Sequence, residues 1–233
     1  MRNKLDFFQN QRTVLFALAG GSALALGFLA ARVLYTDNRS FLFLAWNLFL
    51  AWIPVFLALA APSKGRRWWI AGLALLWLLF FPNAPYILTD LIHLKRRPGV
   101  PFLLDAAMLF AFALNGLLLG NVSLYVWHRR WNRTLGSRNS WLLVGVIFLM
   151  SGYGIYIGRI LRFNSWDALF QPLMLGQSLY YDLFAPGRGR LMAGTVACLG
   201  SLMLVFYAVI YSLLEFRPNR RMILRKEKFS QNY

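Results

Sequence analysis

Residues 68–94 read WWIAGLALLWLLFFPNAPYILTDLIHL, and this stretch decides the class of fold. Its first part, residues 68–81, is apolar throughout and would form about 21 Å of α-helix. An apolar run of this kind is typical of a helix that faces lipid, whereas a helix of a soluble protein carries an apolar stripe on one side only. The stretch therefore predicts a membrane span, and its second half places polar and ionisable groups within that span.

Apolar segments of similar length recur on both sides, and together they predict an all-α fold, a polytopic transmembrane helical bundle of about six spans. The predicted spans are residues 13–35, 41–61, 68–94, 101–127, 140–163 and 191–215. They form one transmembrane domain, residues 13–215, between a tail of residues 1–12 and a basic tail of residues 216–233. The first span is too long for the core of a signal peptide, so we expect it to be retained. Residues 168–184 are too short and too polar for a span, and we expect an interfacial or re-entrant segment there.

The composition agrees with this fold class. The chain is 59% hydrophobic and 14% charged, whereas soluble domains are about half apolar and about a quarter charged. The net charge of +17 comes from Lys and Arg in the segments between apolar runs, not from a basic face interleaved with aromatic residues, which argues against nucleic-acid binding. The single cysteine, Cys198, excludes an intrachain disulfide and a thiol-ligated metal site.

Basic residues also predict the orientation. Of the 25 Lys and Arg residues, 16 lie in the two tails and in the loops after the second and fourth spans, and six lie in the other three loops. Cytoplasmic segments of membrane proteins carry the excess of Lys and Arg, so both termini are expected inside. The six basic residues of the C-terminal tail would attract anionic lipid, at about 1 kcal/mol each near the membrane surface.

The third predicted span contains a proline interruption followed by polar residues. Pro82 removes a helical hydrogen bond, and Asn83 is a good N-cap for a second short helix that presents free N–H groups toward the outer face. On that helix Asn83, Tyr86, Asp90 and His93 fall on one stripe at α-helical spacing. Polar groups at this depth face protein or a water-filled cavity, so the stripe is either a ligand site or a set of hydrogen bonds between helices.

A second polar group follows the fifth span. Arg159 and Arg162 are three residues apart, on the side that the charge rule disfavours, so we expect pairing with an outer carboxylate, Asp90, Asp105 or Asp167. One of the two arginines would then remain for a substrate phosphate or carboxylate. The candidates for ligand binding are Asn83, Tyr86, Asp90, His93, Asp105, Arg159, Arg162, Asn164 and Asp167.

Small residues four apart predict close approach of helices. Such sets occur in the first, fourth and fifth spans: Ala19, Ala23, Gly27 and Ala31, then Gly116 and Gly120, then Gly154 and Gly158.

Two motifs carry a resemblance to a known family. FPNAPY at residues 81–86, with Thr89, Asp90 and His93, is followed by GIYIGR at residues 154–159 and RFNSWD at residues 162–167. In this order they resemble the uncharacterised bacterial membrane-protein family called domain of unknown function 1361. The resemblance runs from about the second span to the start of the sixth. It implies the bundle fold and a bacterial plasma (inner) membrane location, and it implies no activity.

Three functions remain open. The outer cluster could bind or transport a small polar or anionic ligand, although the sequence has no internal repeat of the kind that many transporters show. It could belong to an enzyme acting on a lipid-linked or periplasmic substrate, with Asp90 or His93 as general base. It could also fix helix packing in a non-catalytic assembly component. A multi-histidine zinc site on the outer side is excluded, because the other histidine, His128, lies at the inner face. A carboxylate-rich magnesium or manganese site with ligands from Asp90, His93, Asp105 and Asp167 is left open, and no cofactor is assigned. Apart from the bilayer and its anionic lipid no partner is indicated, and oligomerisation is left open.

The orientation can be tested by cysteine labelling. In a Cys198→Ala background, Arg97→Cys should react with an impermeant thiol reagent in intact cells, and Arg133→Cys only after lysis, because residues 97 and 133 lie in loops on opposite sides. The reverse pattern would contradict the charge count and place the polar cluster in the cytoplasm.

Overall fold

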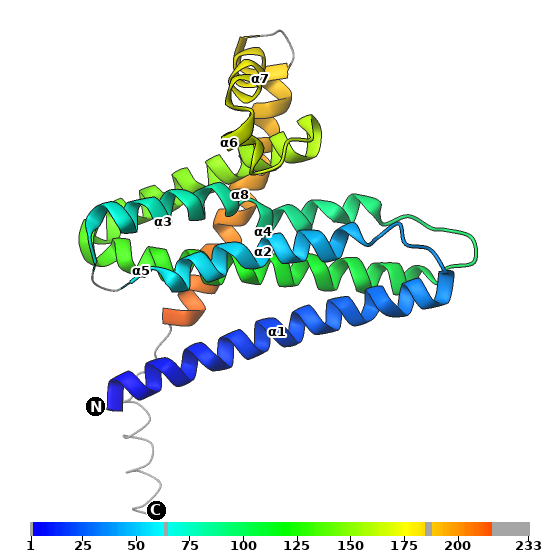
Figure 1. Ribbon diagram of the computed structural model, residues 1–233, viewed down its shortest axis with the longest axis horizontal. Helices are drawn as coiled ribbons and strands as arrows, with labels where there is room; N and C mark the ends of the chain where they lie inside the picture. Colours follow the sequence, from blue (N-terminus) through cyan, green and yellow to red (C-terminus); the bar gives the residue numbers. More distant parts are fainter. Residues whose placement is uncertain (1, 63–64, 185–187, 216–233) are drawn as a thin grey trace, which may run out of the picture.

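The computed structural model describes residues 2–62, 65–184 and 188–215, and every regular element in these ranges is helical (Figure 1). The basic C-terminal tail lies outside the described residues. The elements in chain order are α1 (Arg2–Thr36), α2 (Phe43–Ala60), α3 (Arg67–Phe80), α4 (Asn83–Tyr86), η1 (Ile87–His93), α5 (Phe102–Tyr156), η2 (Ile157–Leu161), α6 (Asp167–Phe170), α7 (Pro172–Phe184) and α8 (Arg188–Glu215). The helix of α1 begins at Arg2, so it includes the segment expected to be an N-terminal tail.

Five helical segments are long and apolar enough to cross a membrane: Arg12–Thr36, Phe43–Ala60, Arg67–His93, Phe102–Leu161 and Arg188–Glu215. In the most apolar 18-residue stretch of each segment, at most 44% is buried inside the protein. Most of the apolar surface therefore faces outward, as lipid contact requires and as a soluble fold would not tolerate.

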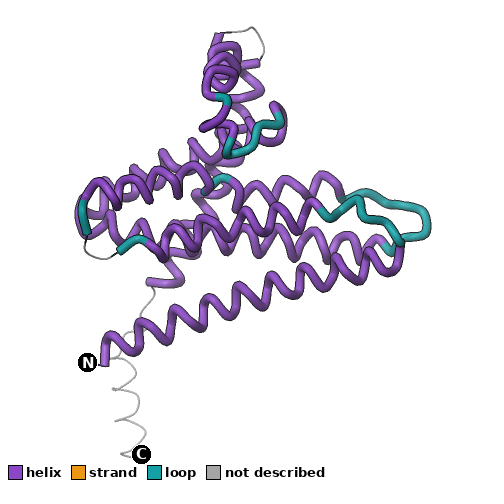
Figure 2. Tube along the Cα trace, in the orientation of Figure 1, coloured by secondary structure: helices purple, strands orange, loops and turns teal. Residues whose placement is uncertain are grey.

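The longest segment holds two of the predicted spans because α5 folds back on itself. Gly136 lies inside α5 at φ 78° and ψ 168°, a conformation that is open essentially to glycine alone. Figure 1 shows the two arms of α5 joined at one end of the bundle. The loops collect at this end and at the opposite one, where α1 meets α2 and η1 meets α5 (Figure 2).

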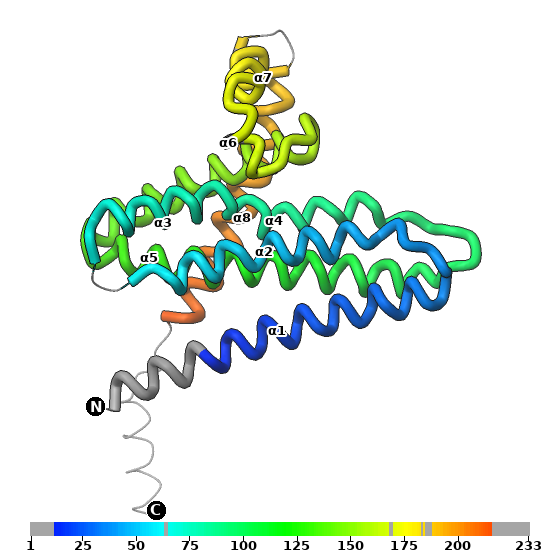
Figure 3. The backbone as a smooth tube through the Cα atoms, viewed as in Figure 1, coloured from blue at the N-terminus to red at the C-terminus, as the bar shows by residue number. Residues whose placement is uncertain are grey.

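Two apolar cores lie along the bundle. The first joins α1, α2, η1 and the beginning of α5, with Leu29, Leu48 and Phe112 among its buried residues. The second joins α3, both arms of α5 and α8, around Trp77 and Phe148. Figure 3 shows α8 running across the direction of the other long helices, against which it packs mainly through α5.

The small-residue sets have different surroundings. A Cβ atom on Gly116 would lie 2.7 Å from the carbonyl oxygen of Ala84, so α5 and α4 are in backbone contact there. On α1 the set is exposed: Ala19, Ala23, Gly27 and Ala31 all face away from the bundle, and nothing lies within 4 Å of a Cβ built on Gly27. The expectation that this set packs α1 within the chain is therefore wrong. The helix buries the opposite side instead, through Leu18, Ala25 and Leu29.

This difference predicts opposite effects for one substitution at two glycines. Gly116→Ala should lower the free energy of unfolding by about 1–3 kcal/mol, because the new methyl group overlaps a backbone atom that has no room to move. Gly27→Ala is the matched control and should be neutral or stabilising by up to about 1 kcal/mol, from helix propensity alone. Thermal unfolding of the two purified variants in mild detergent measures both, and equal effects would contradict the close contact of α4 and α5.

Candidate functional site

The helix that contains the proline motif does not restart as expected. The α-helix α3 ends at Phe80, residues 81 and 82 form a turn, and the backbone of Pro82 stays in the right-handed helical region. Asn83 is not an N-cap: it is the first residue of α4, and its amide donates to the Phe80 carbonyl at 2.9 Å. The prediction of a capped half-helix with a free N-terminus at Asn83 is therefore wrong.

From Ile87 the chain continues as the 3₁₀-helix η1, and this changes which side chains share a face. A 3₁₀-helix has three residues per turn, so residues three apart lie one above the other. Thr89 consequently lies above Tyr86, and its hydroxyl donates to the Tyr86 carbonyl at 2.7 Å. The predicted stripe, which assumed α-helical spacing, omitted Thr89 for this reason.

Opposite η1, the end of the fifth predicted span is also irregular. Residues 157–161 form the π-helix η2, which ends at Arg162 in the left-handed conformation, at φ 62°. A π-helical turn is wider than an α-helical turn and is frequent at functional sites. Arg159 and Arg162 are three residues apart, which in an α-helix would place them on one face. The wider turn and the left-handed residue remove this relation.

Arg159 is the centre of the contacts between η1 and η2. Its guanidinium forms an ion pair with Asp90, and its Nε and Nη2 donate to the Thr89 hydroxyl at 2.9 and 2.6 Å. The Tyr86 ring lies under the guanidinium, 4.4 Å from its central carbon. Asn47 of α2 donates to the second oxygen of Asp90 at 2.9 Å. The predicted pairing of Arg159 with one of the candidate carboxylates is present, and the partner is Asp90.

Two glycines allow this close approach. A Cβ on Gly154 would lie 2.8 Å from Cγ of Pro82, and one on Gly158 would lie 3.1 Å from the Tyr86 ring. The second arm of α5 thus lies directly against the turn at Pro82 and against Tyr86. The two sequence motifs meet in space through these contacts.

The segment after η2 also contacts the proline motif and α2. The Asn83 amide donates to the Ser165 hydroxyl at 2.8 Å, and the Trp166 and Trp46 rings meet edge to face at 6.3 Å between centroids. Asp167 accepts the backbone N–H of Asn164 at 2.6 Å. Asp167 and Asn164 therefore stabilise their own turn.

Arg162 differs from Arg159 in its surroundings. It is exposed, and within the described residues its side chain has neither an ion pair nor a hydrogen bond. Of the two arginines, Arg159 is therefore the one that pairs with a carboxylate in the described part of the chain.

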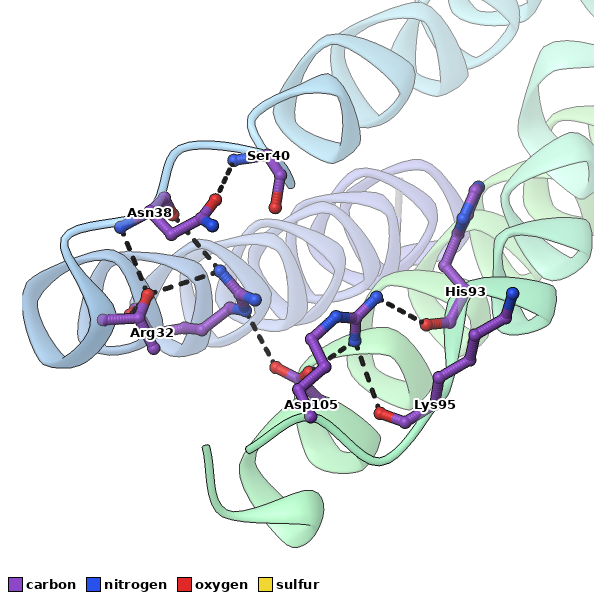
Figure 4. Close-up of polar contacts among 8 residues, drawn as sticks. Arg32, Asn38, Ser40, His93, Lys95 and Asp105 are labelled. Carbon is purple, nitrogen blue, oxygen red and sulfur yellow. Dashed lines mark hydrogen bonds and ion pairs between the residues drawn. The ribbon is translucent and has the colours of Figure 1, made fainter. Parts of the chain in front are cut away.

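Asp105 belongs to a separate network at the end of the bundle. It is 1% exposed, and its two oxygens pair with Arg32 Nε and with Arg97 Nη1, each at 2.8 Å. Figure 4 shows Arg32 of α1 directed at this carboxylate, and Arg97 reaches it from the segment after η1. The Phe41 ring contacts both guanidinium groups, at 4.3 and 4.8 Å from its centroid.

The other hydrogen bonds of these two arginines go to backbone carbonyls and, from Arg32, to the Thr36 hydroxyl at 3.4 Å. Arg32 donates to the Asn38 carbonyl at 3.2 Å, and Arg97 donates to the His93 carbonyl at 3.1 Å (Figure 4). Because Arg97 is part of this network, Arg96, which is exposed, is the better position for the labelling experiment.

His93 lies among aromatic rings and does not form a catalytic pair. Its ring meets Phe43 at 5.3 Å and Phe41 at 6.5 Å between centroids. Asp90 instead faces Arg159 and Asn47, which occupy both of its oxygens. The described residues bring no three His, Cys, Asp or Glu side chains together, and Asp90, Asp105 and Asp167 each have different partners.

Sequence reasoning missed five contributors to these networks: Arg32, Asn47, Thr89, Arg97 and Ser165. Two of them left a usable signal, because Arg32 and Asn47 are isolated polar residues within predicted spans, where an ionisable or amide group needs a protein partner. Nothing in the spacing identified the pairing of Arg97, which depends on the path of the loop after η1.

Taken together, the fold and this arrangement define a class: a polytopic bundle of membrane-length α-helices held by buried ion pairs toward one end. Within that class the chain belongs to the family described as Protein of unknown function (DUF1361), which it matches over residues 46–209. That range includes both motifs and the Asp90–Arg159 pair, and it begins after Arg32. The chain matches no curated protein and no solved structure.

Removing the Asp105 charge should reveal how far the fold depends on its network. Asp105→Asn leaves Arg32 buried without its carboxylate, and the loss of one partner of a buried pair costs about 3–5 kcal/mol. Asp37→Asn is the matched control, since Asp37 is exposed, and it should change the stability little. Unfolding in detergent, together with the amount of protein in the membrane, measures both variants. Equal stability of Asp105→Asn and the parent would show that the network contributes nothing to folding.

Proposed function

We propose that this protein binds a small anionic ligand, bearing a phosphate or carboxylate group, at Arg159. The proposal rests on one observation: only part of the Arg159 guanidinium donates hydrogen bonds to the protein. Asp90, Thr89 and the Tyr86 ring orient it, whereas its Nη1 group donates no hydrogen bond to the described residues. The side chain is 23% exposed, so a ligand can reach it.

An oriented guanidinium is well suited to an anion. Its N–H groups form a rigid fork that matches the oxygens of phosphate and carboxylate, and an arginine already held in place loses less entropy on binding. The Asp90 contacts serve this purpose: the carboxylate is 1% exposed, and Asn47 holds its other oxygen. Asp90 is thus a positioning residue for Arg159.

The charge balance also favours an anion. Asp90 compensates Arg159, and Arg162 is exposed and without an ion pair in the described chain, so its positive charge stays at the surface. Such a charge raises the local concentration of anions and their rate of association. Arg162 therefore attracts the ligand, and Arg159 holds it.

The excess of basic residues in the tails and in the loops after the second and fourth spans supports an outward-facing site, in the plasma membrane of a bacterium.

Among binding, transport and catalysis, ligand binding is the step that the geometry supports. Transport would use the same group, whereas general-base catalysis would need an Asp90 that is free to accept a proton. Both oxygens of Asp105 are paired, one of them with the buried Arg32, and we assign this network to helix packing.

Phosphate binding tests the proposal. The purified protein is unfolded thermally in mild detergent in sodium phosphate and in sodium chloride of equal ionic strength. A ligand that binds only the folded state stabilises it by about 2.7 kcal/mol at a concentration 100 times its dissociation constant. Arg159→Lys keeps the charge but loses the fork, and it should weaken phosphate binding about tenfold or more.

Two further variants separate specific binding from general charge. Arg162→Gln should weaken binding less than Arg159→Lys does. Arg39→Gln removes an exposed arginine from another predicted outer loop and should leave binding unchanged. The proposal fails if phosphate stabilises Arg159→Gln as much as the parent, or if all the arginine variants lose the same amount.

A further inference from the structure

A groove on another face of the protein is separate from Arg159 and from the Asp105 network. It lies between the second arm of α5, α7 and α8, and it has a volume of about 400 Å³. Its walls are apolar and include Leu149 and Tyr153 of α5, Leu179 of α7, and Met192, Ala193 and Val196 of α8.

The sequence of α8 explains why a groove forms at this point. Further along α8, Gly200 packs against the Phe148 carbonyl, and a Cβ on Gly152 of α5 would lie 2.9 Å from the Val196 carbonyl, so the two backbones touch. Toward the beginning of α8 the groove face carries alanines at 193 and 197, which are too small to fill the space beside α7.

Positive charge flanks the groove. The residues of α8 that line it lie at 192, 193, 196 and 197, and continuing this face one turn toward the start of the helix reaches Gly189. Arg188 and Arg190 stand on either side of Gly189, and both are exposed. No acidic residue lies in the first turn of α8, so the positive end of its dipole adds to the two charges.

The nearest carboxylate offsets this charge only in part. Asp182 of α7 is fully buried, accepts the Tyr156 hydroxyl at 3.0 Å, and pairs with Arg188 at 3.3 Å. Arg188 remains 46% exposed, and Arg190 has no ion pair among the described residues. The pairing with Asp182 holds Arg188 beside the groove and leaves part of its guanidinium open.

We propose that this groove binds an acyl chain of an anionic glycerophospholipid, whose phosphate group is held by Arg188 and Arg190. The surroundings are those of a lipid site: Leu173 and Phe170 are 82% and 79% exposed, and Tyr180 and Tyr181 expose amphipathic rings of the kind that lie at the headgroup level. An apolar groove with two arginines one helical turn beyond its lining fits a molecule with a long apolar tail and an anionic head. A zwitterionic lipid has the tail but not the net charge.

Photo-crosslinking tests the site. The probe is phosphatidylglycerol with a photoactivatable group on one acyl chain, added to the purified full-length protein in detergent, and phosphatidylcholine with the same chain is the comparison. Crosslinks should map to residues 149–153 and 192–197, with phosphatidylglycerol preferred. Arg188→Gln and Arg190→Gln should each reduce that preference about fivefold, the effect of one basic residue near an anionic headgroup. Arg138→Gln, at an exposed arginine near the turn of α5, should not.

A second variant tests the tail independently of the head. Ala193→Trp fills the groove and should abolish the crosslinks at residues 149–153, whereas Leu202→Trp, on an exposed part of α8 outside the groove, should keep them. Equal crosslinking of both lipids would identify ordinary bilayer lipid and overturn the proposal. Crosslinks that persist in Ala193→Trp, or a protein dimer formed through this face that excludes the probe, would overturn it as well.

Discussion

The ion pair between Asp90 and Arg159 joins two parts of the chain that are separated by the whole α5 hairpin and by the loop before it. Its carboxylate is almost completely buried, so the charge depends on protein partners, which are Arg159 itself and Asn47. A buried carboxylate without its cation is strongly destabilising, and this requirement fixes the distance between η1 and η2. The glycines at 154 and 158 and the turn at Pro82 are the backbone features that permit that distance.

Both elements that carry the pair depart from the α-helix, in opposite directions. The tight turn of η1 brings Thr89 into line with Tyr86, and the wide turn of η2 gives Arg159 a direction different from that of Arg162. Runs of 3₁₀-helix as long as η1 are uncommon, because their hydrogen bonds have poorer geometry than those of an α-helix. The contacts of Asp90, Thr89 and Tyr86 with one arginine offset this cost, so the irregular backbone and the polar cluster require each other.

The length and apolarity of the helices could be predicted from the sequence, because both follow from local composition. The pairing of Arg159 with a carboxylate could also be predicted, since an arginine at that depth needs one. The contacts made by the proline motif could not be predicted. Asn83 was expected to cap a helix, but the backbone of Pro82 stays helical, and the amide donates instead to Phe80 and Ser165. The partners of Asp105 depend on how α1 and the loop after η1 pack, and residue spacing does not contain that information.

The three buried carboxylates differ in the number of arginines that pair with them. At Asp105 each oxygen has its own arginine, Arg32 is buried with it, and Phe41 lies against both guanidinium groups, although Arg97 stays 32% exposed. At Asp90 and Asp182 the carboxylate is buried while its arginine stays partly exposed. Burying a carboxylate costs desolvation free energy. An arginine that stays partly exposed offsets less of this cost than a fully buried arginine would. We therefore propose the same kind of ligand for both sites, an anion that completes the charge of the partly exposed arginine.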